Sequence, residues 1–325
     1  MHDLIQFLFS ERPLWITSEG YRQLMMLAFA MHQNPQPNGK AIMPSVKEFF
    51  FIDPPTYKQE AKKALAVLKA KLYQDDATKS INVTDEFDSP ELPQESVAYH
   101  RIWGPIFADS LWWASSKQLE LDVLAAEQNP SISCHFLHIN SPGGEAWYLD
   151  RLSETLQHCT KPILTLYEES CCSAAYHIGC HGNRVLATTQ YDFAGCIGTM
   201  VSFHDFEGYY EKLGIKLIEA RATKSDLKNK MPDDLKNGKP EEFIQRVLNP
   251  MNDEFLTTVR SQRQALSQQD DDAPVMRGEV YFTQESIDVG LADGVSTFVD
   301  AVAEAYQMGV RHSENQQLKH NLYNL

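Results

Sequence analysis

The chain has 325 residues, of which 43% are hydrophobic and 22% are charged. This length is about twice that of a typical domain and predicts two domains, or one large domain with an extension. A formal net charge of −15 argues against nonspecific binding to nucleic acid or to an anionic membrane, because both need a basic surface. The composition also excludes wholesale disorder, so we expect a soluble protein with a substantial core.

The six cysteines all lie between Cys134 and Cys196, and none forms a CxxC pair. This pattern is typical of reduced core thiols in a cytoplasmic protein. The chain begins without a basic leader and has no apolar run of 18 residues, so neither a secretory signal nor a membrane span is expected. No HExxH motif accompanies His177 and His181, which share a predicted helix, so no metal ion and no cofactor are predicted.

Residues 1–95 are expected to form a mostly helical extension. Apolar spacing predicts a helix that begins near Thr17 or Ser18 and a second helix over Glu60–Leu72. Residues 75–95 are polar and acidic, which is typical of a linker, so we place a domain boundary near residue 95. A polar tail over residues 311–325 is expected to be frayed.

Between residues 96 and 310, short apolar runs alternate with amphipathic stretches. This alternation predicts parallel βαβ units and an α/β fold. The expected strands are residues 97–106, 132–139, 162–167, 185–188, 200–203 and 215–218. The expected helices are residues 116–128, 148–159, 171–181, a segment through Tyr209, 240–266, 283–290 and 296–308.

The run Asn140-Ser141-Pro142-Gly143-Gly144 follows a predicted buried strand and precedes a predicted helix. Two consecutive glycines let the backbone approach a ligand closely, with amide groups aimed outward. Such amides suit a developing oxyanion, although a tight turn without function would explain the glycines equally well.

A second motif, Cys171-Cys172-Ser173-Ala174-Ala175-Tyr176, also lies where a buried strand leads into a helix. A serine with small neighbours can expose its hydroxyl and leave room for a peptide. The amides of Gly144 and Ala174 would then form a two-donor oxyanion hole, with Gly143 beside them. Small residues that allow close helix packing are the alternative interpretation.

Taken together, these motifs resemble the signal peptide peptidase A family of Ser–Lys peptidases, which includes phage prohead proteases. Four further segments agree in order: the strand 97–106, GCIGTM at 195–200, RGEVY at 277–281 and GLAD at 290–293. The similarity covers about residues 97–308. It implies a Clp/crotonase-like fold for residues 96–310, a peptide or protein substrate, and a homo-oligomer that encloses its active sites. A phage-type member would act on capsid or scaffold proteins and be associated with the virion, and a cytosolic relative would degrade signal peptides.

The resemblance implies that the nucleophile is Ser173 and that the general base is a lysine about 50 residues further on. Lys224 is the candidate here, and the serine and lysine of one site could come from different subunits. Lys228 and Lys230 remain alternatives, because the approach to the lysine departs from the family's glycine-rich pattern. A lysine acts as a base only when neutral, so its pKa must fall from about 10.4 towards about 7.

Three other readings stay open. A Ser–His–Asp site of the Clp type would need a histidine, and His204 followed by Asp205 is the best substitute pair. Cys172 is an alternative nucleophile. The same fold also serves crotonase-type acyl-CoA enzymes and catalytically silent scaffolds, in which the placement of Ser173 and Lys224 would be incidental.

Overall fold

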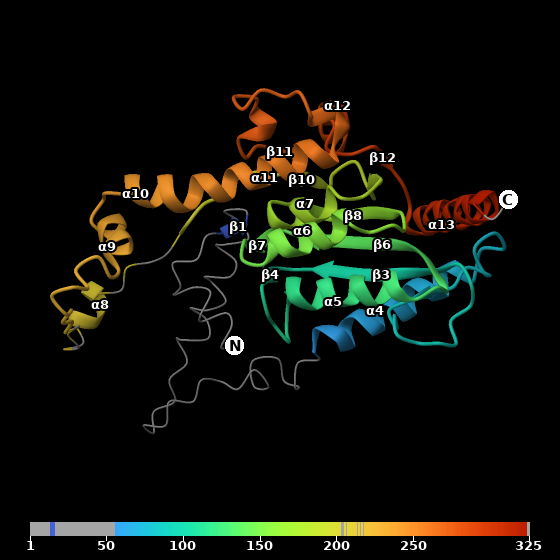
Figure 1. The fold of residues 1–325 in the computed structure, drawn as a ribbon, viewed down its shortest axis with the longest axis horizontal. Helices are drawn as coiled ribbons and strands as arrows, with labels where there is room; N and C mark the ends of the chain where they lie inside the picture. Colours follow the sequence, from blue (N-terminus) through green and yellow to red (C-terminus); the bar gives the residue numbers. More distant parts are fainter. Residues whose placement is uncertain are drawn as a thin grey trace, which may run out of the picture.

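The fold is built on a sheet whose central strands, β3 (Ser96–Trp103), β6 (Ile132–Ser141) and β8 (Ile163–Cys172), are parallel (Figure 1). The computed structural model describes residues 14–16 and 56–323, except for 203, 204, 206, 213, 215 and 217. The three strands are buried on both faces, which explains their near-continuous apolar sequences. The α/β fold class is therefore confirmed.

The strand order of this sheet is β11–β10–β8–β6–β3–β2, and β9 and β12 extend it from β8. The outer strands are β2 (Val83–Thr84), β9 (Arg184–Ala187), β10 (Phe193–Gly195), β11 (Val280–Phe282) and β12 (Gly294–Val295). Of these, β11 runs antiparallel to β10. A separate small sheet has the order β1–β7–β4–β5, from β1 (Leu14–Ile16), β7 (Gly143–Glu145), β4 (Ile106–Phe107) and β5 (Ala114–Ser115).

Helices cover both faces of the large sheet. On one face, α5 (Ser116–Gln128), α6 (Leu149–Gln157) and α7 (Ala174–Gly179) pack on alternate strand residues such as Leu137 and Ile139. On the other face, α4 (Tyr57–Leu72) and α13 (Phe298–Tyr323) pack on Cys134 and Phe136. Since α4 and β2 share this second cluster with β3, they are packed on the same core, and the division at residue 95 stays a prediction.

An arm extends from this core (Figure 1). It consists of α8 (Glu207–Lys212), α9 (Lys230–Lys236), α10 (Glu241–Phe243) and a π-helical turn (Ile244–Leu248). The helix α11, which spans Asn249–Gln262, begins in the arm and ends in the core. The second part of α11 is anchored in the core through Phe255 and Val259, which are fully buried. After α11 the chain returns to the sheet at β11, and the helix α12 (Thr283–Val289) then connects β11 to β12.

Most predicted elements from residue 57 onward are present, with four corrections. In the predicted strand 200–203, Met200 forms only an isolated bridge, and Val201 and Ser202 have no strand structure. The segment 171–181 is not all helix, because β8 continues to Cys172 before α7 begins. Of the predicted strand 215–218, the described residues Lys216 and Ile218 have no strand structure, and Ile218 is 91% exposed. The tail from residue 311 belongs to α13, which continues to Tyr323. The helix predicted near Thr17 lies outside the described residues.

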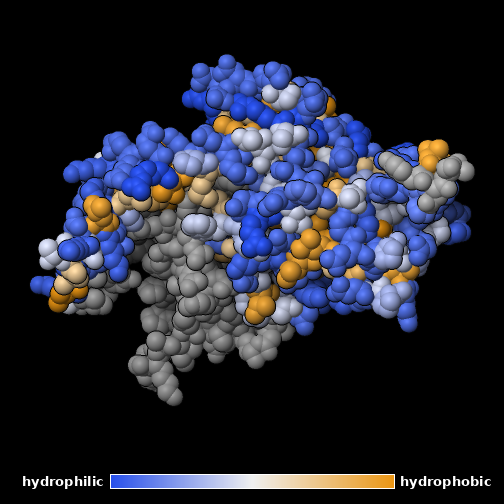
Figure 2. Space-filling model, in the orientation of Figure 1, coloured by the Kyte–Doolittle hydropathy of each residue, from blue (hydrophilic) through white to orange (hydrophobic). Residues whose placement is uncertain are grey.

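The surface in Figure 2 is mostly hydrophilic, in keeping with the acidic composition. Apolar groups are also visible over the middle of this face, and α5 runs there in Figure 1. On α5, Leu121 and Leu124 are the exposed large hydrophobic side chains. Three residues apart, they lie on one side of the helix.

The aspartate of the GLAD segment, Asp293, forms an ion pair with Arg263. Asp293 accepts hydrogen bonds from Arg263 at 2.6 and 3.1 Å and from the Val185 backbone N–H at 2.7 Å. Partial burial opposes the charged form, but these bonds and the Arg263 charge outweigh it and hold the pKa of Asp293 below its ordinary value. The pair joins the segment after α11 to β9 and β12.

We expect Asp293→Asn to lower the free energy of unfolding by about 3 kcal/mol at pH 7, because it leaves Arg263 buried without its charged partner. Urea unfolding followed by circular dichroism measures this loss. Since the folded-state pKa is depressed, the stabilisation is present at neutral pH and is lost as the pH falls through the folded pKa. The matched control is Asp271→Asn, which removes an exposed partner of Arg260 and should change stability by less than about 1 kcal/mol. Equal losses in both variants would contradict this account.

Candidate active site

The sheet register brings the two predicted motifs together. In parallel strands the carboxyl ends lie at one edge of the sheet, and Ser141 at the end of β6 is paired with Cys171 near the end of β8. The Ser170 hydroxyl donates to the Ser141 carbonyl at 3.1 Å, which ties the two strand ends to each other. The segments that follow, Gly143–Glu145 and Ser173, therefore leave the sheet side by side, and α7 contacts β7.

Ser173 occupies a strained turn between β8 and α7. Its backbone has φ 56° and ψ −122°, a conformation that residues with a Cβ rarely adopt. Such a conformation costs roughly 1–3 kcal/mol and persists only where the surrounding structure holds it. Here the Ser173 N–H donates to the Gly195 carbonyl at 2.8 Å. In serine hydrolases of the α/β type, the nucleophile lies on such a strained turn between a strand and a helix.

The two glycines lie in a confined strand of the small sheet. Gly144 is paired with Ile106 of β4 on one side and with Trp15 of β1 on the other. A Cβ on Gly144 would lie 1.9 Å from the Ile106 carbonyl oxygen, so only glycine allows this close approach. Gly143 has φ 103°, and its N–H donates to the Ser141 hydroxyl at 3.2 Å.

We expect Gly144→Ala to destabilise the fold by about 1–3 kcal/mol, because β4 and β7 must separate to admit the new methyl group. Chemical denaturation of the purified chain measures the effect. Gly208→Ala is the control: no atom lies within 4 Å of a Cβ there, and alanine favours the α8 helix. If Gly144→Ala and Gly208→Ala have the same free energy of unfolding, the claim that Gly144 lies close against Ile106 is wrong.

Other segments of the family resemblance also meet at Ser173. Gly195 of the GCIG turn is paired with Cys172, and the Cys196 N–H donates to the Glu279 carbonyl at 2.8 Å. From the GLAD segment, the Leu291 carbonyl accepts the hydroxyl of Tyr176 in α7 at 3.0 Å. Together with the end of β6, these three separated stretches of sequence support the turn at Ser173.

The residue next to the Ser173 hydroxyl is Cys196, which sequence analysis did not single out. Burial raises the pKa of Cys196, and a hydrogen bond with the Ser173 side chain works against that rise. A neutral thiol is not a base, so Cys196 does not activate the serine. Only its position in the GCIG turn could have indicated this contact beforehand.

Lys224 is not beside Ser173 in the single chain. It lies on an exposed turn between α8 and α9, in the arm that extends away from α7 (Figure 1). Lys228 is exposed in the same stretch. Lys230 pairs with Asp234 and with Glu242, and these carboxylates raise its pKa, which disfavours Lys230 as a base. A dyad with Ser173 therefore requires a lysine from elsewhere, such as a second subunit.

Cys172 and the nearby histidines are poorer candidates for catalytic groups than Ser173. Burial raises the pKa of Cys172 to about 12, which keeps its thiol neutral and unreactive. His177 lies one turn after Ser173, but its Nε2 is 3.3 Å from Glu254 of α11. His181 bonds instead to the Ser153 hydroxyl at 3.0 Å, so the two histidines serve different partners. His204 lies outside the described residues.

Comparison with known proteins identifies the relatives of this chain. Residues 155–310 match the family model described as peptidase family S49. Protease 4 of Haemophilus influenzae is 26% identical over 186 residues, which are 56% of this chain and 29% of that protein. A protein of Methanocaldococcus jannaschii named as a protease is 25% identical over 185 residues, 56% of this chain and 58% of that protein. A protein of Enterococcus faecium named as signal peptide peptidase SppA is 25% identical over 182 residues, 54% of this chain and 51% of that protein.

The predicted resemblance to the signal peptide peptidase family is therefore confirmed, and the chain is related to peptidases. It spans about 29–58% of the length of these relatives. Among solved structures, a mutant of a membrane-bound stomatin-specific protease in complex with a substrate peptide matches with a TM-score of 0.42 and 13% identity, over 66% of this chain and 80% of that one. Within the part of the chain that the structure describes, no helix has both the length and the apolarity needed to cross a membrane.

Proposed function

From its kinship with peptidase family S49, we propose that this chain is a serine endopeptidase with Ser173 as nucleophile and Lys224 as general base. The observation that carries the proposal is the strained Ser173 turn beside the paired glycines of β7. The proposed reaction is hydrolysis of a peptide bond, and it needs no cofactor.

In this mechanism, the neutral Lys224 amine takes the proton of the Ser173 hydroxyl while the oxygen attacks the peptide carbonyl. The oxyanion of the tetrahedral intermediate is held by the amides of Gly144 and Ala174, with Gly143 shaping the turn. The lysine then returns the proton to the leaving amine, and an ester joins Ser173 to the acyl part of the substrate. Water hydrolyses this ester, activated by the same lysine.

We place Ser173 and Lys224 of one site on different subunits of a homo-oligomer. Two features support this arrangement: the arm that carries Lys224 projects from the core, and α5 presents Leu121 and Leu124 to solvent in the single chain. A neighbouring subunit that packs over the arm would also remove water from the lysine, which favours its neutral form.

The substrate would bind as an extended strand along β7. This edge already accepts a strand, since β1 pairs with β7 in antiparallel register, Trp15 opposite Gly144. β1 also contacts α7, which begins directly after Ser173, and Ser173 is only 1% exposed. An incoming peptide would therefore displace β1 and take over its backbone hydrogen bonds, as in other cases of β-augmentation. In this way β1 covers the site until substrate arrives.

As a biological role we propose either phage or prophage capsid maturation, with capsid or scaffold proteins as substrates, or cleavage of signal-peptide-like segments in the cytoplasm. A fluorescence-quenched peptide library tests the activity itself. We expect hydrolysis by the purified full chain, at a rate that rises with pH as the base loses its proton. Hydrolysis of a thioester without cleavage of peptides would favour an acyl-CoA enzyme. No turnover of either substrate would favour a catalytically silent scaffold.

A further inference from the structure

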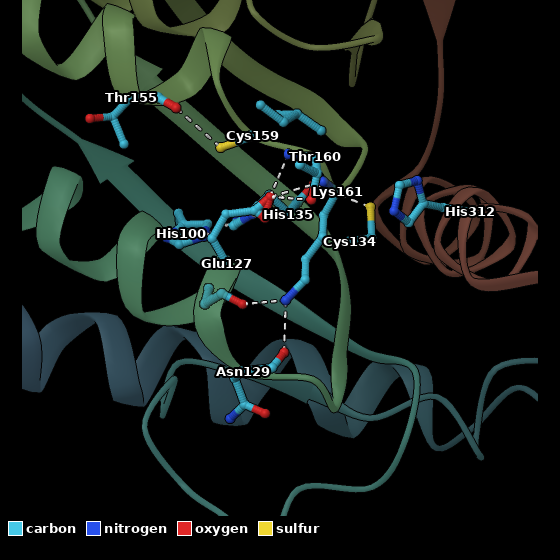
Figure 3. Close-up of polar contacts among 12 residues, drawn as sticks. His100, Glu127, Asn129, Cys134, His135, Thr155, Cys159, Thr160, Lys161 and His312 are labelled. Atoms are coloured by element: carbon cyan, nitrogen blue, oxygen red, sulfur yellow. Dashed lines mark hydrogen bonds and ion pairs between the residues drawn. The ribbon is translucent and has the colours of Figure 1, made fainter. Parts of the chain in front are cut away.

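Three potential metal ligands meet at the end of the sheet opposite to Ser173. Glu127 lies near the end of α5, His135 near the start of β6, and Cys159 just after α6 (Figure 3). A carboxylate oxygen, an imidazole nitrogen and the sulfur of these residues all lie within 4.8 Å of one another. The ligand atoms of a tetrahedral zinc site lie roughly 3.5 Å apart, so closure by about 1 Å would complete the geometry.

Two of the three atoms that face this position lack hydrogen-bond partners, whereas the Cys159 thiol donates to the Thr155 carbonyl at 3.4 Å. His135 is fully buried, and its Nε2 and the Oε2 of Glu127 are both unsatisfied. They lie 3.9 Å apart, which is too long for a hydrogen bond but suits two ligands of one cation. Buried polar groups are almost always satisfied in folded proteins, so this pair points to a missing partner between them.

Neighbouring groups hold the side chains of His135 and Glu127 in place through hydrogen bonds. His100 Nε2 lies 3.1 Å from His135 Nδ1, so His135 can donate its Nδ1 proton there and keep a lone pair on Nε2 for a metal. The other carboxylate oxygen of Glu127 accepts the backbone N–H groups of Thr160 and Lys161 at 2.6 and 2.9 Å. These bonds leave Oε2 directed at His135.

The ammonium group of the nearby Lys161 is held away from the position. Lys161 donates its ammonium protons to the Ala126 and Asn129 carbonyls at 2.6 and 2.7 Å (Figure 3). These carbonyls lie at the end of α5, where a positive charge is favourable. Lys161 therefore caps the helix and leaves the space between Glu127 and His135 to another cation.

We propose that Glu127, His135 and Cys159 bind a zinc ion, with a water molecule as the fourth ligand. A mixed oxygen, nitrogen and sulfur donor set suits Zn²⁺ better than Mg²⁺ or Ca²⁺, which prefer oxygen alone. On binding, the Cys159 thiol releases its proton to solvent and the thiolate bonds to the metal. The ion would link the loop after α6 to α5 and β6 at the end of the sheet opposite to Ser173, so the site does not depend on the proposed peptidase activity.

Cobalt titration of the full-length protein tests the site, because a thiolate bound to Co²⁺ gives a charge-transfer band in the near ultraviolet. We expect about one ion per chain, displacement by Zn²⁺, and a rise in Tm with Zn²⁺. The Cys159→Ser variant should lose the band and bind at least tenfold more weakly. Glu127→Gln should also bind more weakly, and its amide oxygen can keep the bonds to Thr160 and Lys161, so this variant is expected to fold.

Cys134→Ser is the matched control, since Cys134 is adjacent to His135 in β6 but faces the opposite side of the sheet. It should keep the band and the affinity of the wild type. The proposal is overturned if Co²⁺ gives no thiolate band with the wild type, or if the band persists in Cys159→Ser. Neither outcome bears on Ser173, so failure of the metal site is distinguishable from failure of the peptidase assignment.

Discussion

Replacing Ser173 with alanine is expected to lower kcat for peptide hydrolysis by about 10⁴-fold or more, because no other group can form the acyl-enzyme. KM should change little, since the substitution leaves untouched the backbone edge of β7 that we propose binds substrate. Progress curves with a fluorescence-quenched peptide measure both constants. The alanine also removes the contact with Cys196 but leaves the strained turn, so the variant should fold.

Ser133→Ala is the control for this prediction. Ser133 is buried in β6 near the opposite end of the sheet, and its hydroxyl has no hydrogen-bond partner among the described residues. Its removal should leave kcat unchanged. Full activity in the Ser173→Ala variant would show that the chemistry takes place elsewhere.

Mixing two inactive variants should restore activity if each dyad is shared between subunits. Ser173→Ala alone and Lys224→Ala alone are both expected to be inactive. In a randomly mixed ring of the two, a site is complete when the serine comes from one variant and the lysine from the other. With equal amounts of both, about one quarter of the sites in a head-to-tail ring would be complete, and activity should recover to that level. The measurement is peptide turnover after the variants are dissociated and reassembled together.

One outcome would contradict the sharing of the dyad between subunits, and another would contradict the assignment of Lys224. No recovery in a mixed oligomer, verified by native mass spectrometry, would mean that serine and base belong to the same chain. An active Lys224→Ala variant together with an inactive Lys228→Ala variant would transfer the role of base to Lys228. Lys230→Ala serves as the control, because Lys230 is held as a cation by Asp234 and Glu242.

The core of the fold could be predicted because its strands are long, apolar and bounded by strong turn signals. The segments 132–139 and 162–167 both became central strands, and the helix predicted over residues 116–128 is α5. The proximity of the two motifs also follows from the sequence, since parallel strands bring their carboxyl ends to one edge. Local pattern and tertiary structure agree in this part of the chain.

Local patterns misled where long-range packing decides the structure. The pattern at residues 215–218 suggested a strand, yet Ile218 lies exposed in the arm of the single chain and has no strand structure. Small residues at 171–175 suggested a helix, but pairing of β8 with β6 and β10 extends the strand to Cys172. The polar tail is helical because α13 begins on a buried apolar stretch and continues from there, which propagation allows at low cost.

The proposed metal site could not have been predicted from sequence. Glu127, His135 and Cys159 come from three different elements and form no short motif, so only the packing of α5 and α6 on β6 unites them. Cys159 was expected to be one of several reduced core thiols. The contact of Cys196 with Ser173 likewise depends on the pairing of β10 with β8, and no local pattern encodes it.

The most direct test of the central claim is the site at which a fluorophosphonate reacts with the assembled protein. Tandem mass spectrometry of the digested adduct should place the phosphonyl group on Ser173, with no labelling in Ser173→Ala and strongly reduced labelling in Lys224→Ala. An adduct on another residue, or labelling that is unchanged in Ser173→Ala, would contradict the assignment of this chain as a Ser–Lys peptidase.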